Sequence, residues 1–331
     1  MTHDIHRRAL LRGAAGAMAL PAAGAFATSA FADTWPSRPV KIIVGYPAGG
    51  ANDLVARSVA QGMTEALNGT FVVDNRTGAA GAIGAEAAAK SAPDGATLYM
   101  MSSSQVLAPS LKKSLPYDPV KDFSAIALCA SSSYILCVHP SVPAKTLAEL
   151  IAYAKANPGK LNYASSGVGA GPHLTSALLV ARAGLKMTHV PYRGDTPAIA
   201  DLLAGQVQMY FTSIAPGIPH IQSGAIRPLA IASAKRSSLF PDIPTVAEQG
   251  FPGFDMGAWW GLVAPAGTPK DVITRSESAI VPFLKKPETV ARFKQLGIDP
   301  GEVSGDAFQK FIASEKDRLA DVVKQTGIEA E

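Results

Sequence analysis

The sequence predicts an α/β protein with two lobes, each a mostly parallel sheet flanked by helices. Short runs of β-branched and apolar residues alternate with segments of helical periodicity, and this alternation is typical of helices layered on a largely parallel sheet. The chain has 331 residues, of which 47% are hydrophobic and 17% charged, so it is long enough to bury two cores. A middle block with its own strands and helices favours two lobes over one large sheet.

The first third of the chain begins with a strand, a loop and a helix. The strand covers residues 40–45, the loop runs from Tyr46 to Asp53, and the helix carries apolar residues at Val55, Val59, Met63 and Leu67, one every four positions. The other elements predicted before residue 140 are strands at 71–74, 97–101, 123–130 and 134–139 and an Ala-rich helix at 79–90.

Capping signals mark several helices of the remaining chain. Thr146 and Glu149 form a capping box that begins a helix ending near Ala156. Thr196-Pro197 predicts an N-cap followed by Pro at the first helical position. The other predicted elements are strands at 161–164, 208–211, 227–232 and 259–264, helices that begin near His173 and Thr268, and a last amphipathic helix around residues 308–323. We therefore place lobe 1 at residues 33–132 and 228–331 and lobe 2 at residues 133–227.

Residues 1–32 are typical of an export signal. A basic start with Arg7, Arg8 and Arg12 precedes a modestly apolar stretch that ends at Ala30-Phe31-Ala32, as a cleavable secretory signal requires. The Arg pair resembles a twin-arginine signal, but His6 replaces the usual Ser or Thr, so the export route stays open. We predict cleavage after Ala32. Removing this segment lowers the formal charge from +4 to +2, and without a basic stripe nothing favours nucleic-acid binding.

Two cysteines leave a disulfide open as an alternative to free thiols. Cys129 and Cys137 lie in the two predicted strands on either side of Ser131 to Ser133. If those strands pair as a hairpin, the sulfur atoms can lie opposite each other. If the strands belong to different lobes, the geometry of a disulfide is out of reach. The spacing does not fit a redox or zinc motif.

Two glycine-containing loops predict anion binding. Residues 46–52 and 165–171 each connect a strand to a helix, so their backbone N–H groups lie at a helix start, where the macrodipole favours an anion. Glycine allows a ligand to approach the backbone, and serine adds hydroxyl donors. On facing lobes, the two loops meet across the crevice of an open α/β fold.

Other chemistry finds less support in the sequence. Residues 78–84 and 167–171 lack the glycine spacing and the acidic residue of a dinucleotide fingerprint, and no phosphate-binding G-K-[ST] motif follows them. Ser165 or Ser166 with His173 raises the alternative of a secreted hydrolase, yet the nucleophile elbow G-x-S-x-G is absent. The histidines show no metal-ligand spacing. Arg193 is either a surface charge or the fork that holds a carboxylate. We therefore predict neither a metal nor a cofactor.

Seven blocks in order resemble the solute-binding proteins of tripartite tricarboxylate transporters, the Bug type. The resemblance covers essentially the whole chain after residue 34. It rests on WPSRPVK at 35–41, YPAGG at 46–50 with Asp53, NRTGAAG at 75–81, YASSG at 163–167 with His173-Leu174, VPYRG at 190–194, PDIPTVAE at 241–248 and WGLVAPAGTP at 260–269. Thr77 departs from the family, in which Pro is common at that position.

The resemblance implies a periplasmic binding protein with two α/β lobes of the type II kind that close on a small carboxylate and deliver it to membrane transporter subunits. The implied ligand residues are Ala48, Gly49, Gly50 and Asp53 in the first loop and Ser165, Ser166, Gly167, Gly169 and His173 in the second. We add Tyr46, Ser104, Tyr192, Arg193 and Thr212. Asp53 would repel a carboxylate, so we expect it to cap its own loop or hold a water. Tyr46 and either Trp259 or Trp260 are candidates for stacking on an aromatic acid.

The expected protein is a monomeric receptor and not an enzyme. Di- and tricarboxylates, amino acids and aromatic acids all fit a carboxylate site of this kind. A binding protein that presents its ligand to a membrane-bound kinase, and so senses rather than imports, is the main alternative. A Ser/His hydrolase is the second.

Overall fold

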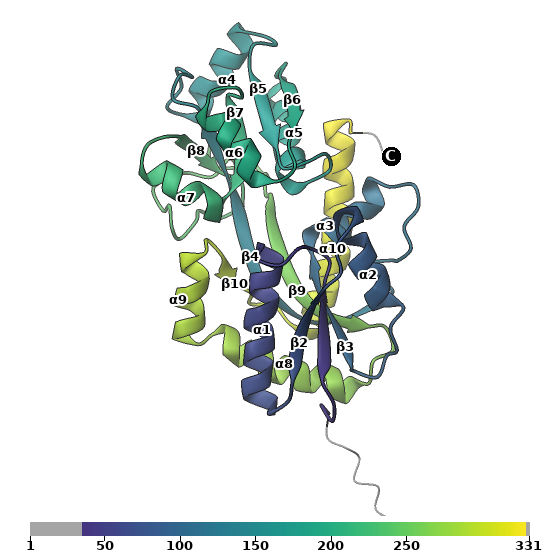
Figure 1. Cartoon of the computed structure of the whole chain (residues 1–331). Coiled ribbons are helices and arrows are strands. Elements are labelled where there is room, and N and C mark those ends of the chain that lie inside the picture. The colour runs from purple at the N-terminus through teal and green to yellow at the C-terminus, as the bar shows by residue number, and fades with distance from the viewer. Residues whose placement is uncertain (1–34, 329–331) are drawn as a thin grey trace, which may run out of the picture. The chain divides into compact units, whose positions relative to one another are not determined.

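Two groups of parallel strands joined by two long antiparallel strands organise the fold (Figure 1). The structure is a computed structural model and describes residues 35–328. The first group contains β1 (Val40–Val44), β2 (Phe71–Asn75) and β3 (Thr97–Ser102), and the second contains β5 (Asn162–Ser165), β6 (Thr188–Pro191) and β7 (Met209–Ser213). The strand order is β2-β1-β3-β9-β4-β7-β5-β6.

The long strand β4 (Phe123–Val138) pairs with β7 of the second group and with β9, which in turn pairs with β3 of the first group. Residues 123–133 lie antiparallel to β9 (Gly257–Pro265), and residues 134–138 pair with β7 and with β8 (Arg227–Ile231). The short strand β10 (Asp299–Pro300) pairs with residues 130 and 131. The sequence predicts two strands separated by Ser131 to Ser133, but the structure has one. Within each strand group the strands run parallel, as predicted, whereas β4 and β9 run antiparallel to their neighbours, so the complete sheet is mixed.

Helices cover the sheet and connect its parallel strands. They are α1 (Ala51–Leu67), α2 (Ala82–Ala89), α3 (Ser103–Leu107), α4 (Leu147–Ala156), α5 (Gly171–Ala183), α6 (Asp195–Leu203), α7 (Ile214–Gln222), α8 (Lys270–Leu284), α9 (Pro287–Gln295) and α10 (Gly305–Thr326), with single 3-10 turns at Ala79–Gly81 and Ala108–Ser110. The predicted helices agree with these elements, while α3, α7 and α9 lie between predicted elements. The described helices include none that is both long enough and apolar enough to cross a membrane.

Local capping explains where α4 and α6 begin. The Glu149 N–H donates to Thr146 Oγ1 at 3.1 Å, as the capping box predicts. The start of α6 differs from the prediction, because Gly194 and not Thr196 is the N-cap residue. Gly194 has φ +114°, a backbone conformation that glycine adopts without strain. Asp195 thereby becomes the first residue of α6.

Alternating residues of the strands feed cores on opposite faces of the sheet. Ile42 and Val44 pack with α1 and α8 on one face, whereas Ile43, one position away, belongs to the core on the other face. On that second face, Phe308 of α10 packs edge-to-face on the Trp259 ring. The indole N–H of Trp259 donates to Glu315 at 3.1 Å, which satisfies its polar atom in the core.

The described residues form one compact unit. The boundaries of the two lobes at residues 132/133 and 227/228 therefore stay a prediction. The export signal and its cleavage after Ala32 lie outside the described residues.

Both cysteines are buried free thiols on the single strand β4. They are eight positions apart on extended chain, about 26 Å along the strand, whereas a disulfide needs Cα atoms within about 7 Å. Burial raises the pKa of the Cys129 thiol to about 12 and also raises the pKa of Cys137. The hairpin that a disulfide requires is therefore absent from this part of the chain.

We expect neither thiol to react with an aromatic disulfide reagent at pH 8 in the native protein, and both to react in guanidinium chloride. Burial and the raised pKa values keep the reactive thiolate scarce until the chain unfolds. Absorbance of the released thiolate counts the groups. Rapid native labelling, or fewer than two thiols after unfolding without reductant, would contradict the assignment.

Candidate ligand-binding cleft

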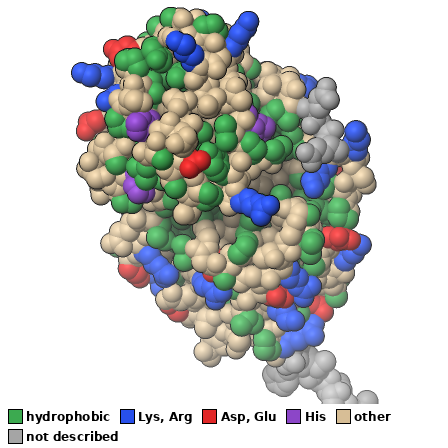
Figure 2. Space-filling model, turned by 45° about the horizontal axis from the view of Figure 1, so that its top comes forward, with side chains coloured by type: hydrophobic (Ala, Val, Ile, Leu, Met, Phe, Trp, Pro, Cys, Tyr) green, Lys and Arg blue, Asp and Glu red, His purple; other side chains and the backbone are tan. Residues whose placement is uncertain are grey.

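A cleft of about 910 Å³ lies where loops from the two strand groups face each other. Figure 2 shows a hollow in the molecular surface with basic side chains at its rim. One wall comes from the loop after β1 and from the segment after β3, and the other from the loops after β5, β6 and β7. These are the carboxyl ends of the strands, where ligands bind in open α/β folds.

Four helix N-termini meet at this cleft. Gly50 to Asn52 at the start of α1, Ala170 to Pro172 at the start of α5, Gly194 to Thr196 at the start of α6, and Ser213 before α7 all line it. The first N–H groups of a helix have no partner within the helix, and the macrodipole places partial positive charge there. The cleft therefore favours anions from both walls.

Eight of the predicted site residues line the cleft: Tyr46, Ala48, Gly50, Ser104, Ser166, Gly167, Gly169 and Arg193. Six others do not line it: Gly49, Asp53, Ser165, His173, Tyr192 and Thr212. Lining residues that the sequence reasoning missed include Asn52, Ser103, Lys112, Tyr134, Asp195 and Ser213. Most of these six residues follow strand ends or open a helix, a position that identifies them only after strand ends are assigned.

The buried side chain of Asp53 holds the loop after β1 in shape through hydrogen bonds. Its carboxylate accepts hydrogen bonds from the Gly49 N–H at 3.0 Å, from Arg57 Nε at 2.8 Å and from the Asn75 side chain at 3.0 Å. Asp53 is only 2% exposed. Burial opposes its charge, but the bonds from Arg57, Gly49 and Asn75 outweigh burial and hold the pKa of Asp53 below its ordinary value. The expected capping role of Asp53 agrees with these bonds, and Gly49 donates to Asp53 and not toward the cleft.

A stack of aromatic rings supports the second loop. The His173 and His189 rings lie parallel with centroids 3.9 Å apart, and Tyr163 stacks on the other side of His189 at 5.1 Å. The Gly169 N–H donates to His173 Nδ1 at 3.1 Å. Gly169 itself has φ +74°, which favours glycine at this turn. His173 therefore fixes the loop and does not reach the ligand space.

The Ser165 hydroxyl is held beneath the same loop. Its Oγ lies 2.6 Å from His189 Nε2, and it accepts the Gly167 N–H at 3.2 Å. Ser165 is fully buried and pairs with His189 rather than with His173. A nucleophile must reach its substrate, so this arrangement does not support Ser165 as the nucleophile of the hydrolase alternative.

Tyr192 and Thr212 also have structural partners. The Tyr192 hydroxyl donates to Asp201 at 2.6 Å, and the Thr212 hydroxyl donates to the Ser213 carbonyl at 3.0 Å. Trp259 and Trp260 are both buried and belong to the cores on opposite faces of the sheet, but only Trp260 also lines the cleft. Of the proposed stacking residues, Tyr46 and Trp260 therefore face the ligand space.

Two cations and one acid give the cleft its formal charge. Exposed Arg193 and half-buried Lys112 line it, and neither forms an ion pair with another described residue. Asp195 lines the wall at the start of α6. Residues 35–328 contain no cluster of acidic, His or Cys side chains arranged for a metal ion.

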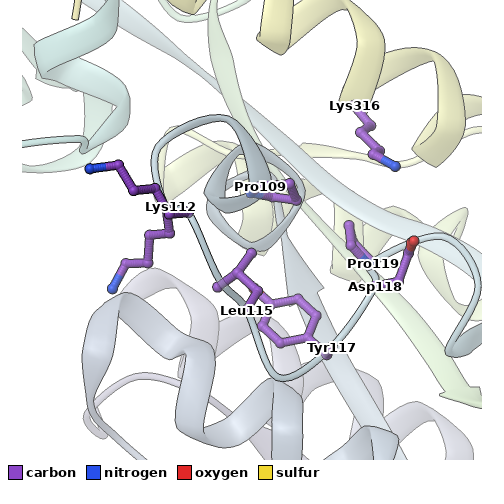
Figure 3. A pocket seen from close by; sticks show the side chains of 8 residues that line it. Pro109, Lys112, Leu115, Tyr117, Asp118, Pro119 and Lys316 are labelled. Atoms are coloured by element: carbon purple, nitrogen blue, oxygen red, sulfur yellow. The ribbon is translucent and has the colours of Figure 1, made fainter. Parts of the chain in front are cut away.

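A smaller pocket of about 200 Å³ lies next to the cleft (Figure 3). Lys112 borders both cavities, whereas its neighbour Lys113 borders only the smaller one, together with Tyr117, Asp118 and Lys316. Substitution of Lys112 and of Lys113 therefore removes the same charge from two neighbouring positions, of which only the first borders the cleft.

The fold and the anion-binding cleft define a periplasmic binding protein of the α/β class. Residues 55–328 match the model of the tripartite tricarboxylate transporter family receptor, and the chain belongs to that family. The family consists of binding receptors, so the protein is not an enzyme.

Individual relatives agree with this assignment. Protein BugT of Bordetella pertussis is 39% identical over 298 residues, which cover 89% of this chain and 91% of the relative. The structure described as R. palustris Rpa4515 with adipate has a TM-score of 0.80 and 33% identity, and it covers 90% of this chain and all of that chain. The structure of periplasmic binding protein BugD has a TM-score of 0.77 and 35% identity, with the same coverage of both chains.

Replacing Asp53 by Ala is expected to lower the free energy of unfolding by roughly 2–3 kcal/mol, because three donors lose a buried charged partner. Urea unfolding measures the change. Arg57→Ala is the control, since Arg57 is about half exposed and the loss of one exposed partner of an ion pair changes stability little. Equal effects of the two variants would show that Asp53 does not organise the loop.

Acid should destabilise the protein through His173. Burial, with a smaller effect of His189, lowers the pKa of His173 to about 4 from 6.5. Below pH 6.5 the unfolded chain binds a proton that the folded protein resists, so the free energy of unfolding falls as the pH drops from about 6.5 to about 4. The full loss is about 3 kcal/mol.

His173→Asn tests this pH dependence, because the Asn oxygen replaces the Nδ1 acceptor for Gly169 and does not titrate. Urea unfolding at several pH values between 4 and 7 should show a flatter dependence in the variant than in the wild type. An unchanged slope would mean that other groups cause the acid sensitivity.

Proposed function

We propose that the protein captures a small organic carboxylate outside the cytoplasm and delivers it to the membrane subunits of a tripartite transporter. Membership of the receptor family supports the transport role, and the relative described with adipate supports a carboxylate ligand. The observation that carries the proposal for this chain is the meeting of four helix N-termini with Lys112 and Arg193 in one cleft.

The ligand carboxylate accepts hydrogen bonds from the loop after β1 and the loop after β5. On the first wall, the amides near Ala48 and Gly50 and the Ser104 hydroxyl face the space. On the second wall, the donors are in the segment from Ser166 to Gly169. Lys112 and Arg193 add charge-assisted bonds from opposite walls. Gly49, Asp53, Ser165, His173, Tyr192 and Thr212 act indirectly, because they hold these loops in shape.

Ligand capture closes two lobes around the cleft. Lobe 1 contains residues 33–132 and 228–331, and lobe 2 contains residues 133–227. The residues at the crossing support this division, since Ser131 to Ser133 are half-buried in the middle of a strand that is otherwise buried on both sides of them. A hinge requires only a few such residues that absorb a change in backbone angles.

The protein works as a periplasmic monomer whose export signal is cleaved after Ala32. Its relatives include a structure described as a periplasmic binding protein. Delivery requires that the membrane subunits recognise a surface of the closed, ligand-bound form.

A thermal-shift screen of mono-, di- and tricarboxylates, with adipate among them, should yield at least one ligand that stabilises the protein by a few kcal/mol at large excess. A complete lack of stabilisation across the series, or turnover of a ligand, would overturn the receptor function.

Lys112→Ala should then lower the affinity for the most stabilising ligand by roughly tenfold, since one charge-assisted hydrogen bond is worth about 1.5 kcal/mol or more. Arg193→Ala should have a similar effect. Titration calorimetry measures the affinities. Lys113→Ala is the control: it removes the same charge one residue away, outside the cleft. Equal losses for Lys112→Ala and Lys113→Ala would mean that only net charge matters.

A further inference from the structure

The wall of this anion-binding cleft contains an acid. Asp195 lines the cleft at the start of α6, and its two oxygens accept hydrogen bonds from the buried Tyr210 hydroxyl and from Ser213 Oγ, the latter at 3.1 Å. Burial and the nearby Asp195 charge raise the pKa of Tyr210. Tyr210 therefore stays protonated, and its hydroxyl donates a hydrogen bond to Asp195. The carboxylate is thus fixed in place with an acceptor capacity that these two bonds do not exhaust.

A second acceptor belongs to Asn52, a residue of the opposite wall in the first turn of α1. Its side-chain oxygen Oδ1 is buried and has no hydrogen-bond partner among the described residues. Buried polar atoms without a partner are uncommon, because an unpaired buried acceptor is costly. A hydrogen-bond donor on a ligand would satisfy this oxygen once the Asn52 side chain turns toward the cleft.

A plain aliphatic diacid offers only acceptors to these two groups. It would bring its charge near the Asp195 carboxylate without compensation and leave Asn52 Oδ1 unsatisfied. Lys112 and Arg193 can neutralise a ligand carboxylate. They do not supply the hydrogen-bond donor that an unsubstituted diacid lacks and that Asp195 could accept from. The two acceptors therefore fit a ligand with both a carboxylate and a donor group.

We propose that Asp195, assisted by Asn52, recognises an ammonium or hydroxyl group on the ligand, so that the protein selects amino- or hydroxy-substituted carboxylates over unsubstituted ones. This inference rests on the proposed carboxylate-binding function of the cleft. Asp195 is then a specificity-determining residue in addition to its stabilising position in the first turn of α6.

Matched ligands of one chain length test the selectivity. Succinate, malate and aspartate have the same four-carbon skeleton and differ at one carbon by hydrogen, hydroxyl and ammonium. Glutarate, 2-hydroxyglutarate and glutamate form a second series. Titration calorimetry on the wild type should give tighter binding, by about tenfold or more, for the substituted members of whichever series binds.

Asp195→Asn removes the charge and keeps one acceptor oxygen. The variant should lose about tenfold in affinity for the ammonium ligand and less for the hydroxyl ligand, and it should bind the unsubstituted diacid as well as the wild type or better. Asn52→Ala should narrow the same preference without changing the charge of the cleft. Asp271→Asn is the control, because Asp271 is likewise an acid in the first turn of a helix, α8, but lies outside the cleft.

Selectivity is a ratio of affinities measured on one protein sample, so partial unfolding of a variant does not imitate it. Equal affinity for substituted and unsubstituted ligands in the wild type would overturn the inference and leave the receptor function intact. A uniform change for all ligands in Asp195→Asn would overturn it as well. Failure of every carboxylate to bind would instead contradict the proposed function.

Discussion

The pairing of the long strands β4 and β9 is the constraint on which the site depends. Residues 123–133 of β4 pair with β9, which pairs with β3 of the first group, and residues 134–138 of β4 pair with β7 of the second group and with β8. These two strands thus fix the register of the first group relative to the second. Because the parallel strands of each group end toward the same cleft, the helices that follow them present their N-termini to one shared space. The anion preference of the cleft follows from this topology before any side chain is considered.

Side chains around the cleft divide into those that face it and those that hold its loops. Asp53 captures the Gly49 amide, and the stacked His173 captures the Gly169 amide. Both side chains are buried, and burial of a polar group costs free energy. The hydrogen bonds that they form with a glycine turn offset that cost. Preorganised loops lose little conformational entropy when a ligand binds. The cleft can therefore be lined largely by backbone and small residues and still have a defined shape.

Sequence periodicity and capping signals were sufficient to predict most strands and helices and both glycine loops. They could not predict that Ser131 to Ser133 continue one strand, because polar residues between two apolar runs are typical of a turn. Pairing with β9 and, at Ser131, with β10 keeps these residues extended. The resemblance to the family indicated residues such as Asp53, Ser165 and His173 but did not separate direct from indirect roles. Lys112 and Asp195 were missed because a lone charge in a loop or helix start has no sequence signal; only the tertiary fold brings it to the cleft.

In the function proposed here, a carboxylate binds between the N-termini of α1 and α5. A crystal structure of the protein grown with its most stabilising carboxylate tests it most directly. The predicted result is density for the carboxylate within hydrogen-bond distance of the loop amides at residues 48–52 and 166–171, with Lys112 or Arg193 at its charged end. Density for the ligand in the smaller pocket beside Lys113 and Lys316, with the cleft occupied only by solvent, would contradict the account.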